Sequence, residues 1–106
     1  MNHLIAALPA QLPPFKAQDG LGGDAVAHVK FFTPDAGWTW YLTEYNPTTC
    51  EGFGLVVGNE TELGYFSLIE VGDLRGPLGL PVERDVWFDP TKLRDLKETP
   101  AWLKEA

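Results

Sequence analysis

V-K-F-F-T-P-D-A-G-W-T-W-Y-L-T-E, residues 29–44, is the stretch that decides the fold. Side chains alternate between two faces along residues 25–33 and again along 38–45, which is the period of a β-strand. Pro34-Asp35-Ala36-Gly37 separates the two runs. Proline fits the second position of a type I turn, and glycine tolerates a positive φ at its end. The stretch therefore predicts an antiparallel hairpin.

Further strands are expected after the hairpin. Residues 52–57, 63–71 and 83–88 predict a third, fourth and fifth strand, separated by segments rich in glycine, proline and polar residues. The 63–71 segment is apolar on both of its faces, which predicts a central strand covered on both sides.

Helices are expected only near the ends of the chain. The spacing of Leu4, Ile5 and Leu8 predicts a short helix before Pro9. A second helix is expected to start at Asp89-Pro90-Thr91, with Pro100 breaking the tail into two pieces.

Together these elements predict an α+β fold, namely a single antiparallel sheet of about five strands with short terminal helices. A barrel-like sheet is an alternative, because Gly52, Gly54 and Gly64 lie where strands can bend. The length of 106 residues predicts one domain. We divide it into a lead-in (1–24), a sheet (25–88) and a C-terminal helical tail (89–106).

The apolar face of these strands predicts the core. We expect eight side chains to be mostly buried: Val29, Phe31, Leu42, Leu55, Val57, Phe66, Leu68 and Val86.

The composition is acidic, with 8 Lys and Arg against 15 Asp and Glu and a net charge of −7. Nucleic acids and anionic membranes attract positive surfaces, so direct binding to either is not expected. The charge suits docking onto a basic protein surface, and it equally suits solubility alone. One cysteine, the lack of a basic leader and the lack of a long apolar run favour a cytoplasmic protein.

No catalytic motif is present. His3, His28 and Cys50 lack the spacing of metal ligands. Ser67 lies in a predicted strand rather than in a nucleophile elbow, and the glycine-rich segments do not match a phosphate-binding loop. We therefore predict no metal, no cofactor and no catalytic residues.

A set of polar and aromatic residues remains as a candidate binding site. One interpretation is an arginine–carboxylate cluster beside an aromatic wall, able to hold a planar or cationic ligand or a protein partner. The other is structural, with Arg84 paired to a carboxylate, Glu44 before Asp85, and the tryptophans in the core. We favour the structural interpretation. The set comprises Trp38, Trp40, Glu44, Tyr65, Arg75, Arg84 and Asp85.

Several long motifs resemble a bacterial family catalogued as domain of unknown function 2958. They are V-K-F-F-T-P-D-A-G-W-T-W-Y-L-T-E (29–44), F-G-L-V-V-G (53–58), E-L-G-Y-F-S-L (62–68) and R-G-P-L-G-L-P-V-E-R-D (75–85). The resemblance covers about residues 12–90 and implies no established activity or catalytic residues. Members of that family resemble accessory proteins of plasmids, phages and integrated elements. This implies interference with a host defence complex, as an anti-restriction or anti-CRISPR protein.

Three functions follow as hypotheses. The first is a non-enzymatic counter-defence protein that binds a protein partner, which could itself bind nucleic acid. The second is an enzyme that binds a small molecule or nucleotide derivative through Arg75, Arg84, Glu44 and Asp85. The third is a structural accessory subunit. The sequence names neither the partner nor the oligomeric state.

Overall fold

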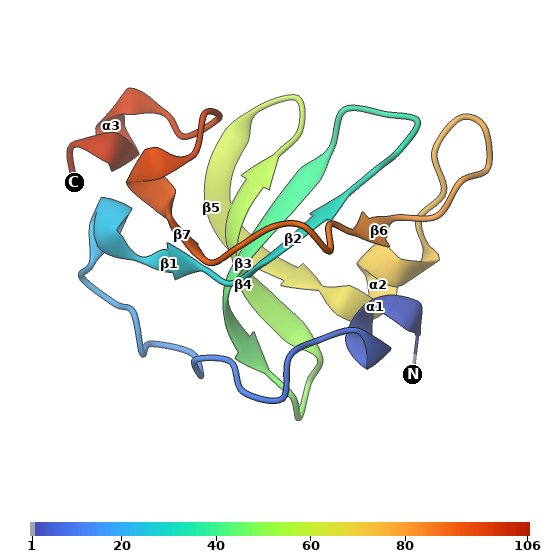
Figure 1. Ribbon diagram of the computed structural model, residues 1–106, viewed down its shortest axis with the longest axis horizontal. Helices are drawn as coiled ribbons and strands as arrows, with labels where there is room; N and C mark the ends of the chain where they lie inside the picture. Colours follow the sequence, from blue (N-terminus) through green and yellow to red (C-terminus); the bar gives the residue numbers. More distant parts are fainter. Residues whose placement is uncertain (1) are drawn as a thin grey trace.

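The computed structural model describes residues 2–106, and at its centre is an open antiparallel sheet (Figure 1). The strand order is β5-β4-β3-β2-β6, and two further strands, β1 and β7, pair separately. This confirms the predicted α+β class with a five-stranded antiparallel sheet. Because β5 and β6 do not pair with each other, the sheet is not closed and the barrel-like alternative is wrong. The bounds are β1 Val26–Ala27, β2 Val29–Phe32, β3 Thr39–Asn46, β4 Glu51–Val57, β5 Thr61–Ser67, β6 Glu83–Arg84 and β7 Thr91–Lys92.

Short helices gather at the two ends of the sheet (Figure 1). At one end α1 (His3–Ala6) packs beside α2 (Leu68–Asp73). At the other end α3 (Ala101–Lys104) packs against the 3₁₀ turns η1 (Gly22–Asp24) and η2 (Leu93–Asp95). The short helix predicted before Pro9 is therefore confirmed.

The predicted hairpin is formed by β2 and β3, with Val29 opposite Leu42 and Phe31 opposite Trp40. The 25–33 segment is not one strand, however. At His28 the backbone N–H donates to the carbonyl of Leu42 (2.8 Å), and the chain before it turns away to form β1.

Two groups of buried side chains pack around the sheet. One contains Phe31, Leu42 and Leu68, and the other contains Leu55 and Leu93. Of the eight predicted core residues, Val57 and Phe66 are only half-buried. The remaining buried members of the prediction are Val29, Phe31, Leu42, Leu55 and Leu68.

Val86 was expected in the core, and this prediction is wrong, because its side chain is 74% exposed. The predicted 83–88 strand ends at Arg84. The N–H of Asp85 still donates to the carbonyl of Lys30 (2.9 Å), but its Oδ1 then accepts the N–H of Trp87 (3.0 Å). This turn removes Val86 from the sheet.

The prediction of a central strand over residues 63–71 is also wrong, both in where the strand ends and in where it lies in the sheet. The strand ends at Ser67, whose hydroxyl accepts the N–H of Glu70 (3.3 Å) and so caps α2. Ser67 and Glu70 have the spacing of a capping box, a signal of helix onset. In addition, β5 is an edge strand rather than a central one.

No helix starts at Pro90, which corrects another prediction. Thr91 and Lys92 are extended and pair with β1, and the N–H of Leu93 donates to the carbonyl of Ala25 (2.9 Å). This tertiary pairing overrides the local helix-start signal. Pro100 breaks no helix, because η2 already ends at Asp95 and Pro100 is instead the N-cap of α3.

Candidate functional site

The seven residues of the predicted set do not form one site. Glu44 is only 5% exposed and lies just after a β-bulge in β3. Its two carboxylate oxygens accept the N–H groups of Lys16 (3.0 Å) and Gln18 (2.7 Å). Glu44 therefore fastens the lead-in segment to the sheet, and both of its oxygens already accept backbone N–H groups.

Arg84 does not pair with Glu44, so the predicted ion pair is wrong. Its guanidinium donates to the carbonyl of Ala7, at the end of α1, and its buried Nε has no partner among residues 2–106. The register explains why. Arg84 pairs with Phe31, whereas Glu44 lies beyond the part of β3 that β2 reaches.

Two other members of the set have local partners. Asp85 forms an ion pair with Lys30 (3.7 Å). Tyr65 is 66% exposed on β5, where its ring lies 5.3 Å from Phe15 and 4.8 Å from Phe53. Neither lies with the remaining three residues of the set.

Trp38, Trp40 and Arg75 do come together. Trp38 lies just before β3 and Trp40 lies within it, and their indoles stack with ring centroids 6.0 Å apart and planes 27° apart. Trp40 is buried, while Trp38 is 40% exposed. They form one wall of a hollow of about 380 Å³, which we call the Trp38 cavity. It is lined by Thr33, Ala36, Trp38, Trp40, Leu74, Arg75, Gly76 and Pro77.

Asp35 holds the two loops of this cavity together. Its Oδ2 accepts the N–H of Leu78 (2.8 Å), which ties the β2–β3 turn to the 74–81 loop. Its Oδ1 is buried and has no hydrogen-bond partner within the described chain. Gly76 packs directly on this carboxylate, so a Cβ at position 76 would overlap it. The cavity wall therefore requires both residues.

Arg75 lies at the end of α2, and its guanidinium donates to the carbonyls of Leu74 (2.8 Å) and Gly72 (3.3 Å). Carbonyls at a helix C-terminus favour a positive charge. Arg75 is also the first Lys or Arg after Lys30 in the chain. It is thus the one cation that this cavity offers to a partner.

Exposed apolar side chains lie on the 74–81 loop, which supplies Leu74 to the lining of the cavity. Leu74, Leu78 and Leu80 are 46%, 79% and 42% exposed, respectively. Together with Trp38 we call these residues the apolar rim. Exposed apolar side chains gathered on one loop mark interaction surfaces more often than scattered ones do.

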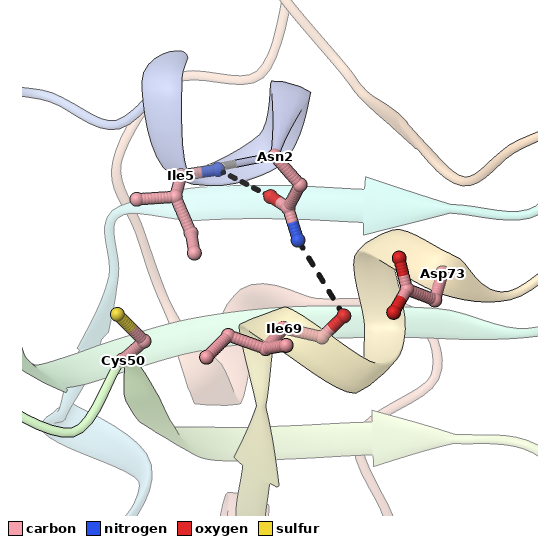
Figure 2. A pocket seen from close by; sticks show the side chains of 5 residues that line it. All are labelled: Asn2, Ile5, Cys50, Ile69 and Asp73. Atoms are coloured by element: carbon pink, nitrogen blue, oxygen red, sulfur yellow. Dashed lines mark hydrogen bonds between the residues drawn. The ribbon is translucent and has the colours of Figure 1, made fainter.

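Two further hollows adjoin α1. One, of about 520 Å³, lies between α1 and α2, and Figure 2 shows its lining residues. Asn2 bridges the two helices there, accepting the N–H of Ile5 (3.0 Å) and donating to the carbonyls of Leu68 (2.7 Å) and Ile69 (3.5 Å). The other, of about 600 Å³, shares Ile5 and Cys50 with the first. Asn2 therefore joins α1 to α2.

Burial and local contacts raise the pKa values of two tyrosines, Tyr41 and Tyr45. Burial, followed by the hydrogen bond to Glu98, raises the pKa of Tyr41. Burial, followed by Cys50, raises the pKa of Tyr45 to about 12. Neither phenol can then act as a base at neutral pH. Within residues 2–106 no group of three His, Cys, Asp or Glu side chains is placed to hold a metal ion.

Trp87 is a surface feature that the sequence interpretation did not single out. Its side chain is 90% exposed in the turn after β6. In the sequence it lies within an apparent strand, and no local signal marks it as exposed. Apolar exposure of this size makes it a second candidate contact residue.

These features define a small acidic α+β protein with an open sheet, an aromatic hollow and an exposed apolar rim. The chain belongs to the family described as "Protein of unknown function (DUF2958)", whose model matches residues 2–101. This confirms the resemblance seen in the sequence. Searches of curated proteins and of solved structures found no match. Over residues 2–106, no helix is long and apolar enough to cross a membrane.

Proposed function

We propose that this protein acts by binding a protein partner rather than by turnover. The observation that supports the proposal best is the Trp38 cavity with its apolar rim. A tryptophan stacked on a buried neighbour is rigid, so little side-chain entropy is lost when it is covered. Exposed tryptophans beside a preformed hollow are typical of residues that dominate binding energy.

The charge of the chain indicates the partner. Residues 31–74 contain seven Asp and Glu but no Lys or Arg, so β3, β4, β5 and α2 carry no positive side chain. A basic protein surface is complementary to this distribution. The specific form of our proposal is a cytoplasmic counter-defence inhibitor, encoded by a mobile element, that occupies the basic surface of a host nuclease or other nucleic-acid-binding complex.

We do not propose an enzyme. That hypothesis required Arg75, Arg84, Glu44 and Asp85 at one pocket. Instead Arg75 lines the Trp38 cavity, Glu44 binds backbone N–H groups, and Asp85 pairs with Lys30. No single described hollow brings these four groups to one substrate.

The test is a titration of candidate host nucleases and defence complexes, at low and high salt, with Trp38→Ala beside the wild type. We expect stoichiometric inhibition that weakens with salt. Trp38→Ala should weaken binding by about 30-fold, the effect of a hot-spot residue worth about 2 kcal/mol.

Trp102→Ala is the matched control. Trp102 is also exposed, at 57%, but it lies on α3 at the other end of the sheet. Its removal should leave binding unchanged. Inactivation of many target molecules by one molecule of this protein would contradict the binding proposal. Equal losses from both tryptophan variants would contradict the assignment of the surface.

A further inference from the structure

The free edge of β5 is a second surface with a definite chemistry. β5 is seven residues long and forms one side of the sheet, so it pairs with β4 only. At about 3.3 Å per residue it extends over about 23 Å. None of its residues is buried, whereas six of the eight residues of β3 are.

The register shows which backbone groups point outward. The N–H of Leu68 donates to the carbonyl of Cys50 (2.9 Å), and the N–H of Gly58 donates to the carbonyl of Glu60 (3.0 Å). Both pairs fit the β4–β5 register, in which Gly54 is opposite Gly64. Hydrogen-bonded pairs alternate in an antiparallel ladder, so the even-numbered residues of β5 face β4.

The N–H and C=O groups of the odd-numbered residues therefore point away from the sheet. These residues are Thr61, Leu63, Tyr65 and Ser67. Among residues 2–106 no hydrogen bond reaches these groups in Thr61, Leu63 and Tyr65, whereas the carbonyl of Ser67 accepts the first hydrogen bond of α2 as its N-cap. None of the four is proline, so every donor is present.

Apart from the charged side chain of Glu62, this edge lacks the usual protection against strand addition. Natural edge strands carry lysine or proline, contain a bulge, or are covered by another element. β5 contains no lysine and no proline, and its register with β4 is unbroken over all seven residues. At the opposite side of the sheet β6 has only two residues. The long unprotected edge is thus confined to β5.

The charges around β5 decide what can pair with it. Glu60, Glu62 and Glu70 are exposed in and beside the strand, and residues 31–74, which include β5 and its partner β4, contain no Lys or Arg. Lys16, beside the Phe15 ring that packs on Tyr65, is a positive side chain near the strand. A second copy of this chain would bring the same acidic side chains together across the new ladder, which is unfavourable. An extended segment rich in Lys or Arg would place opposite charges there.

We infer that the free edge of β5 binds a basic, extended segment of a partner protein by strand addition. Backbone groups of Thr61, Leu63 and Tyr65 supply the hydrogen bonds, and the neighbouring glutamates select positive side chains. The inference rests on the backbone register and on charge. It does not depend on the apolar rim, so either surface can fail its test without the other.

The first test is amide hydrogen exchange, followed by NMR, with a blocked hexapeptide of alternating Lys and Val as the probe. In the free protein the amides of Leu63 and Tyr65 should exchange quickly, and those of Gly64 and Phe66 slowly. The peptide should protect Leu63 and Tyr65 at least about tenfold, the effect of gaining a backbone hydrogen bond in place of water.

Two control peptides separate charge from strand pairing. A Lys-Pro hexapeptide has the same charge but lacks alternate N–H donors, and a Glu-Val hexapeptide reverses the charge. Both should bind at least about tenfold more weakly than the Lys-Val peptide. Equal binding of the Lys-Pro peptide would overturn the inference. So would protection of Leu63 and Tyr65 that grows with protein concentration in the absence of peptide, because a second copy would then be the occupant.

The second test compares Tyr65→Pro with Tyr65→Ala. Both remove the ring from Phe15 and Phe53, but only proline removes the outward N–H, and edge strands tolerate proline at such positions. Tyr65→Pro should bind the Lys-Val peptide about tenfold more weakly than Tyr65→Ala, and Trp38→Ala should bind it like the wild type. If Tyr65→Pro does not fold, the exchange experiment on the wild type decides. Equal affinities of a folded Tyr65→Pro and Tyr65→Ala would overturn the inference.

Discussion

Glu44 shows how one residue can look functional in a sequence and be structural in the fold. A carboxylate at the end of an aromatic strand was a reasonable candidate for ligand binding. In the structure both of its oxygens accept backbone N–H groups, from Lys16 and Gln18. Lys16 has a positive φ of 73°, so this carboxylate holds the lead-in in an uncommon conformation.

Replacement of Glu44 by glutamine should therefore destabilise the protein. The substituted amide nitrogen would face a backbone N–H group, so one partly buried donor would lose its acceptor. We expect the free energy of unfolding to fall by about 2–3 kcal/mol, measured by urea denaturation. Glu62→Gln, at an exposed position of β5, is the matched control and should change it by less than about 0.5 kcal/mol. Similar effects of both variants would contradict the role given to Glu44.

His28 connects folding to pH. Burial lowers its pKa below 6.5, because the charged imidazolium loses solvation in the fold. The unfolded chain therefore binds a proton at a higher pH than the folded chain does. Stability should be unaffected by this group above pH 6.5 and should decrease as the pH falls through 6.5 toward the lowered pKa.

Thermal unfolding of the wild type and His28→Gln between about pH 7.5 and about pH 5.5 tests this linkage. The Tm of the wild type should decrease over this range, and part of that decrease should be absent in His28→Gln. His3→Gln, the other histidine variant, should still show the part of the Tm decrease that protonation of His28 causes. A wild-type Tm that rises on acidification over the same range would contradict the expected direction of this pH dependence.

At the scale of the element, the strand patterns were informative and the ends of the elements were not. Alternation and turn chemistry predicted the β2–β3 hairpin because both signals lie within residues 29–44. Alternation alone could not show where β5 ends, although the capping spacing of Ser67 and Glu70 was present in the sequence. The end of β6 follows from the local turn between Asp85 and Trp87, which alternation does not show, whereas the β1–β7 pair depends on a tertiary contact that no local pattern contains.

The same limit applies to the candidate site. Trp38 and Trp40 were predictable as neighbours because alternate residues of a strand share a face. Arg75 was named with them, but its place in the Trp38 cavity depends on Asp35 fastening the 74–81 loop. Glu44 and Arg84 were predicted to meet, and the strand order separates them.

The β4–β5 ladder provides a matched pair of glycine substitutions. Gly54 and Gly64 are opposite each other, yet their surroundings differ. A Cβ at Gly54 would overlap the backbone carbonyl of Tyr41, whereas a Cβ at Gly64 has nothing within 4 Å. Gly54→Ala should cost about 3 kcal/mol or more in the free energy of unfolding. Gly64→Ala should be neutral or stabilise by up to about 1 kcal/mol. Comparable losses in denaturant titrations of both variants would contradict this register.

At the scale of the whole molecule, charge affects folding and binding in opposite directions. The net charge of −7 is unevenly distributed, since residues 31–74 contribute seven negative charges and no positive one. Repulsion among these carboxylates opposes the compact state. The same carboxylates attract a basic partner. Salt should therefore reduce the repulsion that opposes the compact state, and it should also weaken the attraction to a basic partner.

Raising NaCl from about 50 mM to about 500 mM shortens the Debye length from about 14 Å to about 4 Å. We expect the free energy of unfolding to rise on the order of 1 kcal/mol, or about 4–8 °C in Tm, while binding of the Lys-Val peptide weakens at least about tenfold. NaCl is preferable to sulfate, which also strengthens apolar burial. The double variant Glu60→Gln, Glu62→Gln should reduce both responses, because it removes charge next to β5. A Tm that falls with NaCl, or peptide binding that does not change, would show that the acidic segment does not control the corresponding process.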